Sequence, residues 1–114
     1  MSQITSIAGD EEPLAAAMTI DVEDWFQVEN LRGVIQRPVW DSYESRVVNN
    51  TDRMLQILAD RGVCATLFVL GWIAERHPAL VKRISTAGHE IAAHGHDHEL
   101  VYNMTPENFK EDVY

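Results

Sequence analysis

Three of the five histidines of this 114-residue chain fall within five residues, His94-Gly95-His96-Asp97-His98. Neutral imidazole is a common ligand for zinc and related divalent ions. His94 and His98 are four residues apart, so one helical turn would bring both to a single ion, whereas an extended segment would place all three histidines on one face. The cluster therefore predicts a metal site, and the alternative is a solvated, histidine-rich loop.

A second cluster of candidate side chains consists of the carboxylates of Asp21, Glu23 and Asp24. Three carboxylates within four residues repel one another, and a divalent cation would compensate their charge. Asp21 and Glu23 share one face if a strand continues through them, whereas Asp24 lies beyond it. Taken alone, the cluster is explained equally well by an exposed acidic turn.

Three short apolar runs are expected to form the strands that position these clusters. Residues 14–21 end on the acidic cluster, residues 63–70 are apolar on both faces, and residues 90–93 lead directly into the histidines. Because parallel strands end at the same edge of a sheet, the first and third strands would bring carboxylates and histidines together. One carboxylate and two histidines would leave metal positions open for water and substrate, as a hydrolytic metal site requires.

Helical spacing of apolar residues separates these runs. One helix is predicted to begin at Asn50 or Thr51 and to stop at Gly62, a second covers residues 78–87, and Thr105 caps a third. The alternation of strands and helices indicates an α/β fold with a parallel sheet.

The remaining segments suggest how the chain is organised. Residues 1–13 are polar and acidic and are expected to form a flexible leader, and residues 14–114 are expected to form one domain. Residues 25–46 lack clear periodicity and are expected to form a long loop, which in a compact domain is often functional. The last helix has barely begun at Tyr114, which indicates the N-terminal portion of a larger, truncated domain.

Charge and composition exclude several classes of function. The formal net charge of -9 argues against nucleic-acid binding by phosphate neutralisation and against docking on an anionic membrane. The single cysteine, Cys64, excludes an internal disulfide. We see neither a signal peptide nor the roughly 20 apolar residues that span a bilayer, and we expect a cytoplasmic location.

The two clusters together resemble the polysaccharide deacetylases, carbohydrate esterase family four, which includes the nodulation-type chitooligosaccharide deacetylase. Residues 94–98 resemble the family's His-(Ser/Thr)-x-x-His motif, with Gly95 in the Ser/Thr place. Residues 19–24 resemble its Thr-Phe-Asp-Asp-Gly motif but have extra residues and no glycine. The likeness covers about residues 15–114. The subgroup linked to exosortase and exopolysaccharide systems looks closest, through Asp21–Phe26, Asp41–Arg46, Ala65–Trp72 and Gly88–His94.

The resemblance implies a distorted (β/α) barrel and a divalent ion, often zinc. It also implies hydrolysis of N- or O-linked acetyl groups on a polysaccharide or oligosaccharide substrate, in exopolysaccharide or cell-wall glycan metabolism. Carried over, the family's catalytic base falls on Asp21, and its histidine ligands fall on His94 and His98. The family's metal-binding aspartate falls on Asp24 by residue type or on Glu23 by strand phase, and both assignments stay open.

The family's later motifs, which supply an arginine, an acidic partner and a histidine acid, have no counterpart before Tyr114. We therefore expect the rest of the barrel to be missing and the chain alone to bind metal but turn over poorly.

Two other interpretations stay open. Another metallohydrolase is one of them, although the histidine cluster is one residue short of the metallo-β-lactamase pattern, and an amidohydrolase would place it after the first strand. The other is an inactive domain that binds metal or glycan.

Overall fold

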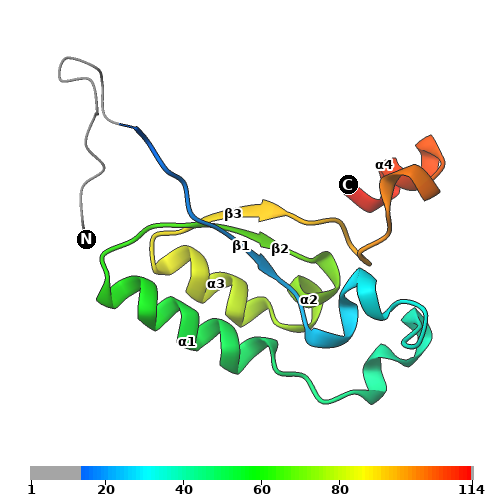
Figure 1. The fold of residues 1–114 in the computed structure, drawn as a ribbon, viewed down its shortest axis with the longest axis horizontal. Coiled ribbons are helices and arrows are strands. Elements are labelled where there is room, and N and C mark those ends of the chain that lie inside the picture. The colour runs from blue at the N-terminus through cyan, green and yellow to red at the C-terminus, as the bar shows by residue number, and fades with distance from the viewer. Residues whose placement is uncertain (1–13, 114) are drawn as a thin grey trace.

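The computed structural model describes residues 14–113, so the predicted leader over residues 1–13 lies outside the described residues. A parallel three-stranded sheet in the order β1-β2-β3 forms its centre (Figure 1). The strands are Thr19–Val22, Thr66–Val69 and Glu90–Ala93. The first residues of the three strands pair with one another, and so do the last. The segments that follow the strands therefore leave the sheet at one edge.

Helices connect the strands and cover one face of the sheet. α1 (Val47–Asp60) joins β1 to β2, and α2 (Gly71–Arg76) and α3 (Pro78–Thr86) join β2 to β3. Figure 1 shows α1 and α3 on the same side of the sheet. α4 (Pro106–Val113) follows the third strand and projects away from the sheet.

The hydrophobic core lies between the sheet and its covering helices. Leu67 of β2, Leu58 of α1 and Ile84 of α3 are all buried. Side chains alternate along a strand, and neighbours in register point to the same face. Asp21, which pairs with Phe68, therefore faces away from this core. Asp21 thus opens onto the uncovered face of the sheet.

The long segment between β1 and α1 is ordered by three 3-10 turns, η1 (Trp25–Gln27), η2 (Glu29–Leu31) and η3 (Arg37–Ser42). Its buried aromatic side chains pack against the start of α2. Phe26 contacts Trp72 edge-on, with ring centroids 5.8 Å apart. Trp40 and Trp72 are also perpendicular, at 5.5 Å. This packing fixes the segment beside the carboxyl edge of the sheet.

The predicted α/β fold with parallel strands is confirmed, but several boundaries differ. β3 has the predicted bounds, whereas the first two strands are shorter than residues 14–21 and 63–70 suggested. α1 begins at Val47 instead of Asn50 or Thr51, because the Asp24 carboxylate accepts hydrogen bonds from the backbone N–H groups of Arg46 and Val47 at the start of the helix. Residues 71–76 form a helix that was not predicted. None of the helices in the described part of the chain is long and apolar enough to cross a membrane.

Candidate metal centre

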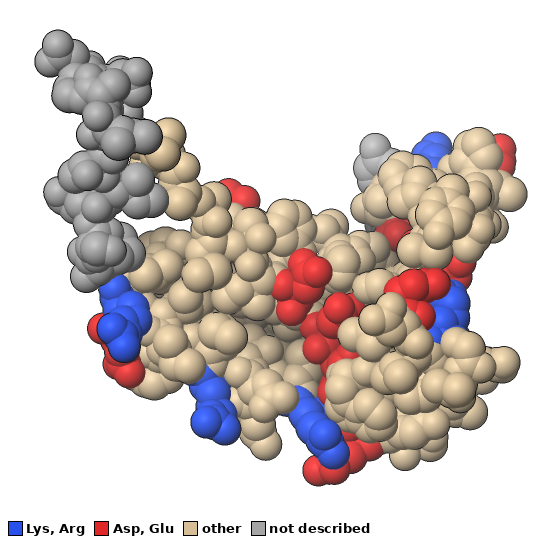
Figure 2. Space-filling model, in the orientation of Figure 1, with Lys and Arg blue, Asp and Glu red and all other residues tan. Residues whose placement is uncertain are grey.

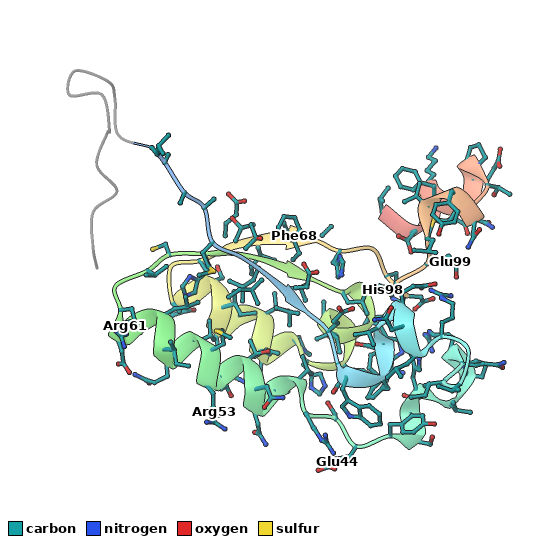
Figure 3. All side chains as sticks on the ribbon, viewed as in Figure 1. Glu44, Arg53, Arg61, Phe68, His98 and Glu99 are labelled. Carbon is teal, nitrogen blue, oxygen red and sulfur yellow. The ribbon has the colours of Figure 1, made fainter. Side chains whose placement is uncertain are left out.

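The carboxyl edge of the sheet brings the acidic and histidine clusters together. β1 ends at Val22 and β3 ends at Ala93, on either side of β2. Figure 3 shows His98 at the end of the molecule opposite Arg61, where the strands finish. On the face shown in Figure 2, acidic side chains gather between the sheet and the 3-10 turns, while basic side chains stand along α1. This edge is where parallel α/β folds place their active sites.

Glu23, His94 and His98 form the centre of the site. Each offers one ligand atom, and these atoms all lie within 4.8 Å of one another. Glu23 Oε2 is 3.0 Å from His98 Nε2 and 3.8 Å from His94 Nε2. The two imidazole rings stand perpendicular, with centroids 5.1 Å apart. Two imidazoles and one carboxylate are a donor set that catalytic zinc sites use.

The hydrogen bonding of these atoms fits a cation. Glu23 Oε2, His94 Nε2 and His98 Nδ1 are buried, and none has a hydrogen-bond partner among the described residues. A buried polar atom without a partner costs about 1–3 kcal/mol, so three of them on neighbouring side chains form an unstable arrangement. A divalent ion would offset that cost by accepting lone pairs from the carboxylate and imidazoles. The residues present therefore fit a metal.

Asp24 does not join this cluster, because its carboxylate lies elsewhere in the fold. The residue is 2 % exposed. Its two oxygens accept hydrogen bonds from the backbone N–H groups of Trp25 and Arg46 and from the Ser45 hydroxyl, at 2.6 to 3.1 Å. A weaker contact of 3.4 Å reaches the Val47 N–H at the start of α1. Asp24 thus joins the start of η1 to the start of α1, where the helix dipole favours negative charge.

Asp21 lies beside the cluster and remains open to solvent. Its Oδ2 is 3.8 Å from His94 Nε2, and its side chain is 56 % exposed. The carboxylate therefore stands next to His94 and within reach of a molecule that approaches from the uncovered face. An exposed carboxylate in this position could accept a proton from such a molecule.

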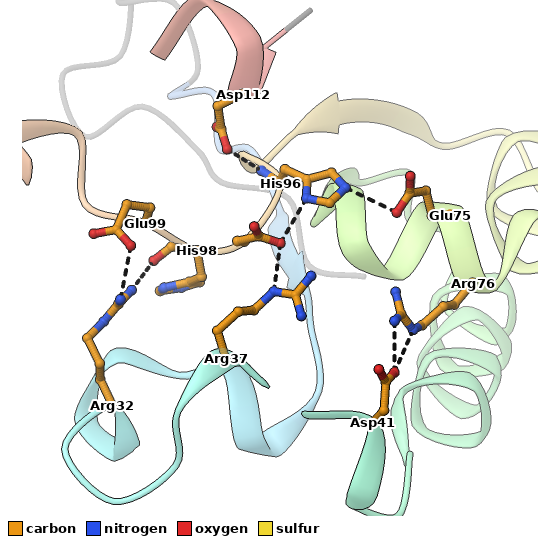
Figure 4. Close-up of polar contacts among 10 residues, drawn as sticks. Arg32, Arg37, Asp41, Glu75, Arg76, His96, His98, Glu99 and Asp112 are labelled. Carbon is orange, nitrogen blue, oxygen red and sulfur yellow. Dashed lines mark hydrogen bonds and ion pairs between the residues drawn. The ribbon is translucent and has the colours of Figure 1, made fainter. Parts of the chain in front are cut away.

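His96 points away from the site. The histidine segment is neither a helical turn nor an extended strand, because Gly95 and His98 adopt φ angles of +69° and +60°. These left-handed residues turn the His96 ring toward Asp97, at 2.8 Å, and Glu75, at 3.2 Å (Figure 4). The shared face predicted for an extended segment is therefore wrong, and two of the three histidines meet.

Two arginines near the histidine segment were not predicted. Arg32 donates to the His98 carbonyl at 2.6 Å, and Arg37 donates to the Asp97 carboxylate at 3.0 Å. Figure 4 shows both reaching the segment from the 3-10 turns. Their partners lie more than 50 residues away along the chain, and only the expectation of a functional loop over residues 25–46 pointed toward them.

Comparison with known proteins gives a family match. The sequence model of the polysaccharide deacetylase family matches residues 34–114. That is more than half of the chain. The chain belongs to the polysaccharide deacetylase family. The matched range contains both histidines of the site, whereas Asp21 and Glu23 precede it.

Two of the relatives that match the chain are named as deacetylases. A peptidoglycan-N-acetylglucosamine deacetylase from Bacillus cereus is 33% identical over 63 residues, which are 55% of this chain and 30% of the relative. A chitooligosaccharide deacetylase from Rhizobium leguminosarum bv. trifolii is 44% identical over 48 residues, which are 42% of this chain and 22% of the relative. The chain thus matches about a third or less of the length of these polysaccharide deacetylases.

Solved structures of the family have the same fold. A peptidoglycan N-acetylglucosamine deacetylase, solved with 4-naphthalen-1-yl-N-oxidanyl-benzamide, matches with a TM-score of 0.61 and 26% identity, over 85% of this chain and 35% of that one. A Bacillus anthracis pseudoenzyme of carbohydrate esterase family four also gives a TM-score of 0.61, at 20% identity, over 85% of this chain and 27% of that one. The predicted membership of a (β/α)-barrel family is confirmed.

Proposed function

We propose that this chain provides the metal ligands and the catalytic base of a hydrolase that removes acetyl groups from an acetylated glycan. One observation carries the proposal. Ligand atoms of Glu23, His94 and His98 converge within 4.8 Å of one another at the carboxyl edge of the sheet with the exposed Asp21 beside them, and Glu23 Oε2 and His94 Nε2 have no hydrogen-bond partner among the described residues.

The substrate class is supported by the relatives. Their names specify peptidoglycan-N-acetylglucosamine in one case and chitooligosaccharide in another. Both are amino-sugar glycans, so we infer that the acetyl group is N-linked. The peptidoglycan deacetylase supports a cell-wall polymer, and the sequence resemblance adds an exopolysaccharide as the alternative. Because one face of the sheet is uncovered, a glycan could reach Asp21.

Glu23, His94 and His98 would hold the metal, and zinc suits this donor set. The ion would supply Lewis acidity, which polarises a carbonyl and lowers the pKa of water toward about 7. Among the two carboxylates that the sequence left open, Glu23 is the proposed ligand, because both Asp24 oxygens already accept hydrogen bonds from Trp25, Ser45 and Arg46.

Asp21 would act as the general base. Its carboxylate would take a proton from the attacking water as the acetyl carbon becomes tetrahedral. Its contact with His94 at 3.8 Å would hold it close to the reacting group. The low exposure of the Glu23 and His98 side chains, 16% and 17%, would limit competing water at the ligand atoms themselves.

The test is acetate release from N-acetylated glucosamine oligomers by the full-length, zinc-loaded protein, compared with its Asp21→Asn variant. General-base catalysis contributes about 100- to 10,000-fold, so the variant should lose activity by a factor in that range. It should also keep its zinc, because Asp21 lies outside the set of proposed ligands. An Asp21→Asn variant that releases acetate at the wild-type rate would overturn the assignment of the base.

A further inference from the structure

His98 holds an unusual backbone conformation for a proposed metal ligand. Its φ angle is +60°, and it is the one non-glycine residue with positive φ in the part of the chain that the structure describes. L-residues disfavour this region because Cβ crowds the following carbonyl oxygen. Such a conformation persists where surrounding contacts over-determine it. The contacts that hold His98 are therefore part of what aims its imidazole.

The His98 carbonyl is held by Arg32. Arg32 Nη2 donates to the His98 oxygen at 2.6 Å (Figure 4). The same guanidinium donates through Nη1 to Glu99 at 3.1 Å and through Nε to Glu29 at 2.7 Å. The guanidinium of Arg32 thus binds two successive residues, His98 and Glu99, and its position is fixed by Glu29 of η2.

The bracing of Arg32 favours one fixed position for its guanidinium. The hydrogen bond that Arg32 donates to Glu29 raises the pKa of Arg32 above its ordinary value, and the charge of Glu99 acts in the same direction. The group therefore stays charged. Isolated surface ion pairs contribute little to stability. Three acceptors around one planar guanidinium, however, restrict its position far more than a single ion pair would.

We propose that Arg32 is a positioning residue for the metal site, which fixes the backbone of His98 and so directs its imidazole toward Glu23 and His94. The inference rests on the proposed function, because it takes His98 as a ligand. Arg32 acts through the His98 carbonyl and touches neither the ligand atoms nor Asp21 in the described contacts.

Electrostatics and positioning predict opposite results when Arg32 is removed. Arg32→Gln deletes a positive charge near a cation site, so a purely electrostatic effect would tighten metal binding. A positioning role predicts weaker binding, because His98 is no longer held in its left-handed conformation. Partners that orient metal ligands typically change metal affinity by about 10- to 100-fold, and we expect a loss of that order.

The control is Arg83→Gln. Arg83 donates through Nε and Nη2 to Asp52, both at 3.0 Å, and its side chain is 45% exposed against 41% for Arg32. It lies on α3, away from the histidine segment. This variant removes an equal charge and a comparable ion pair without touching the site.

The experiment measures the zinc affinity of each variant by competition with a chromophoric chelator, together with the unfolding midpoint of the metal-free protein. We expect Arg32→Gln to weaken zinc binding about tenfold or more at an unchanged midpoint, and Arg83→Gln to bind as the wild type does. If Arg32→Gln also lowers the midpoint, Arg32→Lys decides the matter. Lysine keeps the charge but cannot hold Glu29, His98 and Glu99 at once, so it should still weaken binding.

Two results would overturn the inference separately. Wild-type zinc affinity in folded Arg32→Gln or Arg32→Lys would contradict the positioning role and leave the proposed metal site intact. Failure of the wild-type chain itself to bind zinc would overturn the proposed function, and this inference with it.

Discussion

The Glu23 carboxylate lies 3.0 Å from His98 Nε2, yet Glu23 Oε2 makes no hydrogen bond with any residue in the described range 14–113. The next residue, Asp24, has both oxygens occupied by hydrogen-bond donors. Two adjacent carboxylates thus have opposite surroundings. Glu23 faces the histidines with an oxygen that makes no hydrogen bond, whereas both Asp24 oxygens accept hydrogen bonds that connect η1 with α1.

This contrast predicts that Glu23→Gln removes metal binding without unfolding the chain. The neutral amide is a poor replacement for a carboxylate ligand, so zinc affinity should fall by at least the roughly 10- to 100-fold that is typical of lost supporting residues. Circular dichroism and the unfolding midpoint of the metal-free protein should stay near the wild-type values. Zinc affinity equal to that of the wild type would show that Glu23 is not a ligand.

Asp24→Asn should have the reverse effect. The amide keeps only one acceptor oxygen, so its NH2 group must face N–H donors in either orientation: those of Trp25 and Arg46 at the Oδ1 position, or those of Arg46 and Val47 at the Oδ2 position. Unpaired buried groups of this kind cost about 1–3 kcal/mol, so urea unfolding of the metal-free protein should show a loss of that size. The folded variant should keep its zinc affinity. A stable Asp24→Asn protein that no longer binds zinc would reverse the proposed roles of the two carboxylates.

Gly71 provides a test of how closely α2 supports the histidine segment. Its N–H donates to the Gly95 carbonyl at 2.8 Å. A Cβ at this position would lie 3.0 Å from the His96 Cα and 2.7 Å from its ring. Gly71→Ala must therefore push the segment away from α2, and overpacking of this kind costs about 1–3 kcal/mol.

The matched control for Gly71→Ala is Gly33→Ala, because nothing lies within 4 Å of a Cβ added at Gly33. Thermal unfolding should separate the two variants, with Gly33→Ala close to the wild type and Gly71→Ala clearly less stable and weaker in zinc binding. Equal stability of both variants would mean that the histidine segment does not depend on this close approach.

Much of the fold could be predicted because it depends on local pattern. Residues 90–93 form β3 with the predicted bounds, and the expectation that the first and third strands end at one edge of a parallel sheet anticipated that carboxylates and histidines would meet. The pairing of His94 with His98 was anticipated by the resemblance to the family's histidine motif, whereas residue type and spacing alone left open whether His96 would join them. These features need no knowledge of distant partners.

The features that were missed depend on partners far away in the sequence. α1 starts at Val47 because Asp24, more than 20 residues earlier, binds the backbone at its N-terminus. His96 leaves the site because Gly95 and His98 adopt left-handed conformations that no periodicity indicates. Arg32 looks like an ordinary loop residue until the fold brings it to the His98 carbonyl.

The most direct test of the metal site is the zinc content of the purified chain, compared between the wild type and a His94→Ala, His98→Ala double variant. His96→Ala is the control, because its imidazole faces Glu75 and Asp97 instead of the other two histidines. We predict about one zinc ion per chain in the wild type and in His96→Ala, since one donor set binds one ion, and none in the double variant. Equal zinc in the wild type and the double variant, or loss of zinc in His96→Ala alone, would contradict the site.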